Sequence, residues 1–132
     1  MAALNPTQFS KLGEQLDSRY KLLLEEVRDE LEKSENQQYV ELVGRMPTDA
    51  GDESIGHALA DLELAIIDRH IREIRDIEAA RARLKDGSFG TCLDCGDSIG
   101  FERLLAYPTA KRCRVCQQQH ERTFASEEIP KL

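Results

Sequence analysis

Apolar residues recur at helical spacing near the start of the chain. The stripe is made of Leu12, Leu16, Leu23, Val27 and Leu31. Steps of four and seven residues put these side chains on one face of an α-helix, and polar residues fill the other faces. Thr7 offers an N-cap for this helix, and Gly44 offers a stop after Val43. The pattern therefore predicts a long amphipathic helix from Thr7 to about Val43.

A second apolar stripe follows a break in the pattern. Residues 44–53 contain Pro47 and two glycines, which is typical of a turn. The later apolar positions are Ile55, Leu59, Leu62, Ile66, Ile74, Ile77 and Leu84. No Pro or Gly lies between Gly56 and Asp86, so we expect one helix of about 32 residues, roughly 48 Å long. The two helices should cover each other's apolar faces as an antiparallel coiled-coil hairpin.

All four cysteines lie in the remaining third of the chain. They form two C-x-x-C pairs separated by seventeen residues: Cys92, Cys95, Cys113 and Cys116. The segment between the pairs is predicted to be hairpin-like and too small to fold without a metal. A short terminal helix is predicted over 117–126. We therefore expect a mainly α fold in three parts: a hairpin over 1–86 with its tip at about 44–54, a zinc finger and C-terminal helix over 87–126, and a tail over 127–132.

The cysteine spacing predicts one structural Zn²⁺ ion. Each pair can place two thiolates on one side of a tetrahedral ion, and four protein ligands leave no open position for catalysis. Gly96 follows the first pair, where a positive φ is often required. Three basic residues next to the second pair would offset the negative charge of the thiolates: Lys111, Arg112 and Arg114. A thiol switch that releases the metal on oxidation stays an alternative.

Composition and charge narrow the classes of molecule that the chain is expected to bind. Charged residues make up 33% of the chain and aromatic residues only 5%, which suits helices that bury a narrow seam. The formal net charge of −7 disfavours direct DNA binding, because phosphate contacts need a basic surface. No apolar run approaches the about 18 residues of a membrane span, and no signal sequence opens the chain. We therefore expect a cytoplasmic monomer that contacts protein, with no membrane association.

The predicted turn holds three carboxylates, and two interpretations of them stay open. Asp52 or Ser54 can cap the second helix, and Glu53 suits its dipole. Alternatively, Asp49 and Asp52 at the end of a long rod could reach a metal ion or basic side chains in a narrow space. The histidines, at 57, 70 and 120, show no catalytic spacing, and no phosphate loop or nucleophile–base set is present. An enzyme is therefore not expected.

A longer motif surrounds the cysteines. It reads Phe89-Gly90-Thr91-Cys92-x-x-Cys95-Gly96, then Ile99-Gly100-x-x-Arg103-Leu104-x-Ala106-x-Pro108-Thr109-Ala110-x-x-Cys113-x-x-Cys116. This motif, with similarity from about residue 49 to 120, resembles the DksA/TraR family of bacterial RNA polymerase regulators. The resemblance implies a transcription regulator that binds RNA polymerase directly, inserts its coiled coil through the secondary channel and modulates initiation. A zinc-stabilised protein–protein adaptor or a thiol-based zinc sensor remains an alternative function.

The resemblance also implies roles for individual residues. The family's tip motif, Asp-x-x-Asp-x-Ala, falls on Asp49, Asp52 and Ser54, with Ser in place of Ala. Arg69 falls on an arginine that helps the family dock on the polymerase rim.

The alarmone ppGpp adds a further expectation from the same resemblance. The positions that bind it in full-length members correspond here to Asp76, Tyr107 and Gln117. None of these residues is basic, and the Asp76 carboxylate would repel a polyphosphate. The resemblance therefore implies polymerase binding with weak or absent ppGpp dependence through that site.

Overall fold

The computed structural model describes residues 4–33, 41, 44, 54–62 and 64–128. The elements in chain order are α1 (Pro6–Lys33), α3 (Gly56–Ala60), the 3₁₀ helix η1 (Ala65–Ile67), α4 (Asp68–Asp86), α5 (Phe101–Ala106) and α6 (Arg114–Glu128). Within these ranges the only β pairing is an isolated bridge between Thr91 and Ser98. The predicted mainly α fold is therefore confirmed. None of the described helices combines the length and apolarity needed to cross a membrane.

The N-terminus of α1 is closed by a reciprocal cap, not by the predicted Thr7. The Gln8 backbone N–H donates to Asn5 Oδ1 over 2.8 Å, and the Asn5 N–H donates to Gln8 Oε1 over 3.0 Å. This arrangement is a capping box, with Pro6 at the first helical position, where its missing N–H costs nothing. The predicted end of this helix at Val43 lies outside the described residues.

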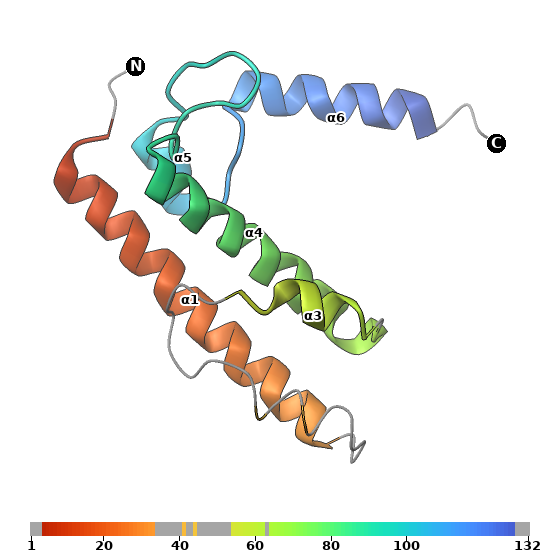
Figure 1. The fold of residues 1–132 in the computed structure, drawn as a ribbon. Helices are drawn as coiled ribbons and strands as arrows, with labels where there is room; N and C mark the ends of the chain where they lie inside the picture. Colours follow the sequence, from red (N-terminus) through yellow and green to blue (C-terminus); the bar gives the residue numbers. More distant parts are fainter. Residues whose placement is uncertain (1–3, 34–40, 42–43, 45–53, 63, 129–132) are drawn as a thin grey trace.

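α1 and α4 pack antiparallel and form the body of the molecule (Figure 1). The buried face of α1 is the predicted stripe extended by Tyr20 and Leu24, and every member is at most 1% exposed. α4 contributes Ile71, Ile74 and Ile77 to the same core. Full burial of each such aliphatic side chain contributes about 1.5–3 kcal/mol. The predicted helical hairpin is therefore present, with its core along the seam.

The prediction of one continuous second helix is wrong for this structure. α3 ends at Ala60, Asp61 and Leu62 form a turn, and Leu64 has extended backbone with φ −92° and ψ 114°. α3 folds back along α4, and Leu59 is fully buried there (Figure 1). The residues of the turn are ordinary helix formers, so tertiary contacts and not local sequence hold the break.

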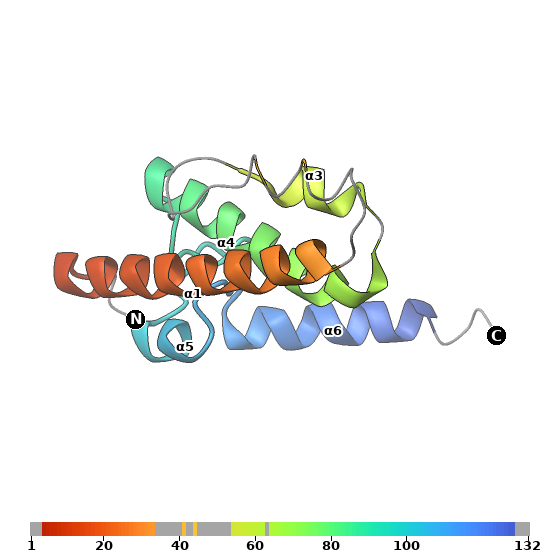
Figure 2. The ribbon, with the colours of Figure 1, turned by 90° about the horizontal axis from the view of Figure 1, so that it is seen from below.

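The finger docks on the base of the hairpin. Gly87, with φ +85°, ends α4 and donates its N–H to the carbonyl of Arg83. The segment between the cysteine pairs, predicted to be hairpin-like, contains the helix α5. Gln15 Nε2 donates to the carbonyl of Leu105 over 3.1 Å and ties α1 to α5. α6 begins at Arg114, before the predicted start, and in the view of Figure 2 α1 lies between α3 and α6.

Candidate functional site

The four cysteine sulfurs converge at one point beyond the end of α4. Their Sγ atoms all lie within 4.8 Å of one another, and those of Cys95 and Cys113 are 3.9 Å apart. Zn–S bonds of about 2.3 Å in a tetrahedron would put two sulfurs about 3.8 Å apart. The donor set therefore fits one tetrahedral Zn²⁺, as the cysteine spacing predicted.

Backbone hydrogen bonds shape the first cysteine turn. The Gly96 N–H donates to the carbonyl of Cys92 over 3.1 Å, and Gly96 has φ +79°. The predicted need for a left-handed residue at this position is confirmed. The Cys92 N–H donates to the carbonyl of Asp97 over 2.8 Å, and the Thr91–Ser98 bridge continues this short ribbon. The paired segments on both sides of this turn therefore hold the first pair of thiols toward the second.

The second pair is held by α6 and by a polar bridge. The Gln117 N–H donates to the carbonyl of Cys113, which places Cys116 in the first turn of α6. The Leu93 N–H donates to the carbonyl of Lys111 over 2.9 Å and joins the two knuckles directly. Arg112 Nε lies 2.9 Å from Asp94 Oδ2. Of the basic residues flanking this pair, Arg112 is therefore tied to a carboxylate beside the sulfurs.

The electrostatics of the thiols favour a divalent cation between them. Burial opposes ionisation of Cys92, yet backbone N–H groups of Cys95, Cys113 and Asp94 outweigh it and lower the pKa of Cys92 to about 6. The hydrogen bond with Cys113, together with desolvation and the other two sulfurs, raises the pKa of Cys116. Four sulfurs this close do not all ionise without a divalent ion between them. Zn²⁺ supplies that charge and ties the two knuckles together.

The zinc centre continues into the hydrophobic core. Cys92 is 3% exposed and belongs to the same buried cluster as Phe89, Ile99 and Leu104. The rings of Phe9 and Phe89 meet edge to face, with centroids 5.7 Å apart, so the start of α1 packs on the finger. The metal therefore fixes the base of the hairpin, which is a structural role.

The residues predicted for the hairpin tip and for docking do not come together in the described structure. Asp49 and Asp52 lie outside the described residues. The Ser54 hydroxyl donates to Glu78 Oε1 over 2.9 Å, near the middle of α4, and it caps no helix. Arg69 is exposed in the first turn of α4. Ser54 and Arg69 are therefore separated along α4.

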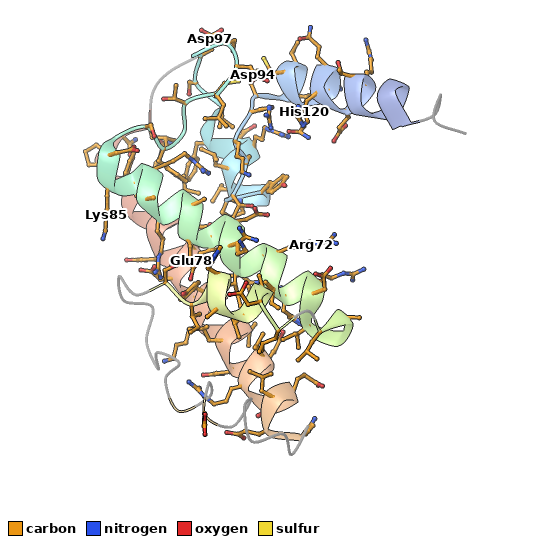
Figure 3. The ribbon with its side chains drawn as sticks, turned by 45° about the vertical axis from the view of Figure 1, so that its right-hand side comes forward. Arg72, Glu78, Lys85, Asp94, Asp97 and His120 are labelled. Carbon is orange, nitrogen blue, oxygen red and sulfur yellow. The ribbon has the colours of Figure 1, made fainter. Side chains whose placement is uncertain are left out.

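Glu78 is a site residue that sequence reasoning missed. Its carboxylate accepts the Tyr20 hydroxyl over 2.6 Å and the backbone N–H groups of Ile55 and Gly56 over 2.9 and 3.3 Å. Figure 3 shows it between α4 and α3, while Arg72 points away from both. Burial, and then the bond to Glu78, raises the pKa of Tyr20. Nothing in the sequence marks this glutamate among the many charged residues of its helix.

The three positions compared with a ppGpp site line one pocket. Asp76, Tyr107 and Gln117 surround a cavity of about 140 Å³ together with Lys111, Arg112 and His120. In Figure 3, His120 lies on the side of α6 that faces this pocket. Lys111 Nζ is 3.8 Å from Asp76 Oδ1. Sequence reasoning did not foresee the basic residues of this wall, because the turn before α6 brings them there.

The chain is similar to several known proteins. Residues 87–122 match the family described as prokaryotic dksA/traR C4-type zinc finger. The RNA polymerase-binding transcription factor DksA of Caulobacter vibrioides (strain NA1000 / CB15N) is 39% identical over 74 residues, which cover 56% of this chain and 52% of that protein. The protein of the same name from Salmonella typhimurium (strain LT2) is 34% identical over 104 residues, which cover 76% and 68%. A solved structure of transcription factor DksA2 from Pseudomonas aeruginosa has 27% identity and a TM-score of 0.45, and the match covers 86% of this chain and 89% of that one.

The sequence matches cover different shares of the chain, and they point to the same family. This chain spans about half the length of the Caulobacter relative. It covers 68% of the Salmonella protein at 34% identity, and all four zinc ligands fall inside the matched finger, 87–122. The chain therefore belongs to the DksA/TraR family and carries its C4-type zinc finger.

Proposed function

We propose that this chain binds bacterial RNA polymerase directly and modulates transcription initiation by inserting the hairpin tip through the secondary channel. The observation that carries the proposal is a helical hairpin anchored on a C4 finger, in a family whose relatives are named RNA polymerase-binding transcription factors. The chain would act as a cytoplasmic monomer and not as an enzyme. Its formal net charge of −7 favours a protein partner over DNA.

The register of the hairpin supports a tip at the predicted aspartates. Arg19 pairs with Glu73, and Glu26 pairs with His70 over 2.8 Å. Each pair is symmetric about a point within residues 46–49, so an uninterrupted hairpin with this register would turn there. Asp49 and Asp52 would then lie at or beside the apex, with Ser54 following. In this proposal the two carboxylates act near the polymerase active centre, and Arg69 docks on the rim.

Co-purification with core RNA polymerase is the first test. The zinc-loaded chain should bind core polymerase, and a photocrosslinker at residue 52 should attach to elements of the polymerase active site. Failure to co-purify would overturn the proposal. A crosslink confined to the outer surface of the polymerase would overturn insertion through the channel.

A matched pair of variants separates this function from an adaptor role. Asp49→Asn/Asp52→Asn should bind polymerase yet lose the effect on initiation, because the shape is kept and the charge removed. Asp17→Asn/Asp29→Asn, with two exposed carboxylates on α1, provides the control and should retain the effect. An adaptor would be insensitive to both changes. Release of zinc by peroxide at physiological doses would favour a sensor.

A further inference from the structure

We propose that residues 54–60, the segment holding α3, form a latch that Glu78 and Tyr20 hold closed against α4. Release of this latch joins α3, η1 and α4 into one helix and lengthens the second arm of the hairpin. The consequence for polymerase binding rests on the function proposed above, while the latch itself does not.

The closed state depends on one carboxylate. Glu78 accepts hydrogen bonds from the Ser54 hydroxyl and from the backbone N–H groups of Ile55 and Gly56. It therefore serves as the missing cap at the start of α3, whose own N-cap residue makes no side-chain bond. The Tyr20 hydroxyl donates to the same carboxylate over 2.6 Å and orients it from α1. Three separate segments of the chain meet at this group.

Gly56 makes the close approach possible. A Cβ atom built at this position would lie 2.7 Å from Arg75 Cγ and 2.7 Å from Glu78 Oε1. Only a residue without a side chain fits between α3 and α4 here. In a continuous helix the same position would favour alanine over glycine, because glycine weakens helix interiors. The residue at position 56 therefore suits the closed state and disfavours the open one.

The open state is accessible to this sequence. The break consists of the turn at Asp61 and Leu62, extended Leu64 and the 3₁₀ turn η1. These residues are ordinary helix formers, and residues 57–86 contain no Pro or Gly. Opening removes Ile55 and Leu59 from their contact with α4 but restores regular backbone hydrogen bonds across the break. The closed arrangement buries apolar side chains, and the open arrangement gains helical hydrogen bonds. The segment is therefore a two-state element.

The two states differ in reach. α4 has 19 residues and is about 28 Å long, whereas a helix over 55–86 would be roughly 48 Å long. The hairpin register around residues 46–49 is compatible with the longer arm, because residues 55–60 would then continue the pairing beyond α4. Closing the latch instead puts Ser54 beside the middle of α4. The latch therefore decides whether the second arm extends.

Amide hydrogen exchange on the zinc-loaded chain of 132 residues tests the latch. In the wild type, the Leu64 and Ala65 amides should exchange faster than those in the middle of α4. Gly56→Ala and Glu78→Gln should each slow the Leu64 and Ala65 amides about tenfold, as the break becomes helix, while the Ile55 amide loses protection. Far-ultraviolet circular dichroism should show a matching gain in helix. The two variants act by different means, steric and polar, so a folding defect in one leaves the other informative.

Two controls define the contrary outcomes. Glu73→Gln removes an α1–α4 ion pair on the same helix without touching α3, and Gly44→Ala adds the same methyl group where no atom lies within 4 Å. Neither control should change exchange at Leu64. Loss of protection in the two latch variants without any gain at Leu64 and Ala65 would mean fraying and would overturn the proposal. Full protection of these amides in the wild type would also overturn it.

A measurement of polymerase affinity tests whether the latch affects polymerase binding. If the channel accepts the long form, Gly56→Ala should bind core polymerase several-fold more tightly than wild type, because less free energy is spent on opening. Equal affinities would overturn the link between latch and polymerase. If neither protein binds, the proposed function fails, and the exchange experiment still decides whether the latch exists.

Discussion

Tyr20 is the residue on which the packing of the hairpin and its polar contacts depend together. Its side chain is fully buried between α1 and α4, its hydroxyl donates to Glu78, and Arg81 lies over the ring at 4.2 Å. Tyr20→Phe keeps the ring and removes one hydrogen bond to a charged acceptor. We expect this change to lower the free energy of unfolding by about 1–2 kcal/mol, measured by urea denaturation at pH 7. No loss would mean that the hydroxyl contributes nothing to the seam.

The same hydroxyl makes stability depend on alkaline pH. Burial, and then the Glu78 carboxylate, raises the pKa of Tyr20 above the ordinary value of 10.0. A group with a raised pKa in the folded state contributes its stability below the unfolded pKa and loses it as the pH rises through the folded one. The wild type should therefore lose more stability than Tyr20→Phe above pH 10. Parallel pH profiles for the two proteins would contradict this assignment.

At the scale of elements, the sequence predicted the features that depend on hydrophobic periodicity and on cysteine spacing. The leucine stripe identified the buried face of α1, and the cysteine spacing identified the metal ligands. The break before α4 was unpredictable from local sequence, because the contacts that hold α3 against α4 join Glu78 to Ile55 and Gly56, which are distant in sequence. The helix α5 was missed because Gly96, Gly100 and Pro108 favoured turns around a six-residue segment.

Zinc removal should separate the finger from the hairpin. Once the ion is gone, nothing bridges the thiols of the two knuckles, and only a small apolar cluster remains to hold α5. A chelator should release one Zn²⁺ per chain, remove exchange protection at Cys92 and Ile99, and leave the Leu23 and Leu24 amides of α1 protected. Cys113→Ser should reproduce this pattern. Loss of protection along the whole of α1 would show that the hairpin depends on the finger.

At the scale of the whole molecule, the two ends of the hairpin are held together by different numbers of contacts. The base is cross-linked by the zinc centre, the Phe9–Phe89 contact and the Gln15 bond to α5. Toward the other end, the second arm is broken and held by hydrogen bonds to a single carboxylate. In the proposed function, a rigid base with an adjustable far end would allow docking and reach to be set separately. Substitutions at Glu78 should therefore alter reach while the finger stays intact.

The ppGpp response expected from the family resemblance would depend on the pocket between hairpin, finger and α6. Lys111 lies 3.8 Å from Asp76, and Arg112 is paired with Asp94, so carboxylates already engage both cations near the pocket. A polyphosphate entering there would meet the charge of Asp76 and would compete for those cations. We therefore expect titration of ppGpp into the complex of this chain with polymerase to show no saturable binding at this pocket.

A variant with added positive charge provides the positive control for that titration. Asp76→Lys/Gln117→Lys removes the repelling carboxylate, releases Lys111 and adds two cations to the wall, so it should gain saturable, salt-sensitive ppGpp binding. Asp61→Lys/Gln118→Lys has the same change in charge at exposed positions outside the pocket and should gain none. Saturable binding by the wild type that is lost in Tyr107→Ala or Gln117→Ala would reverse the conclusion, because the pocket would then bind the nucleotide despite Asp76.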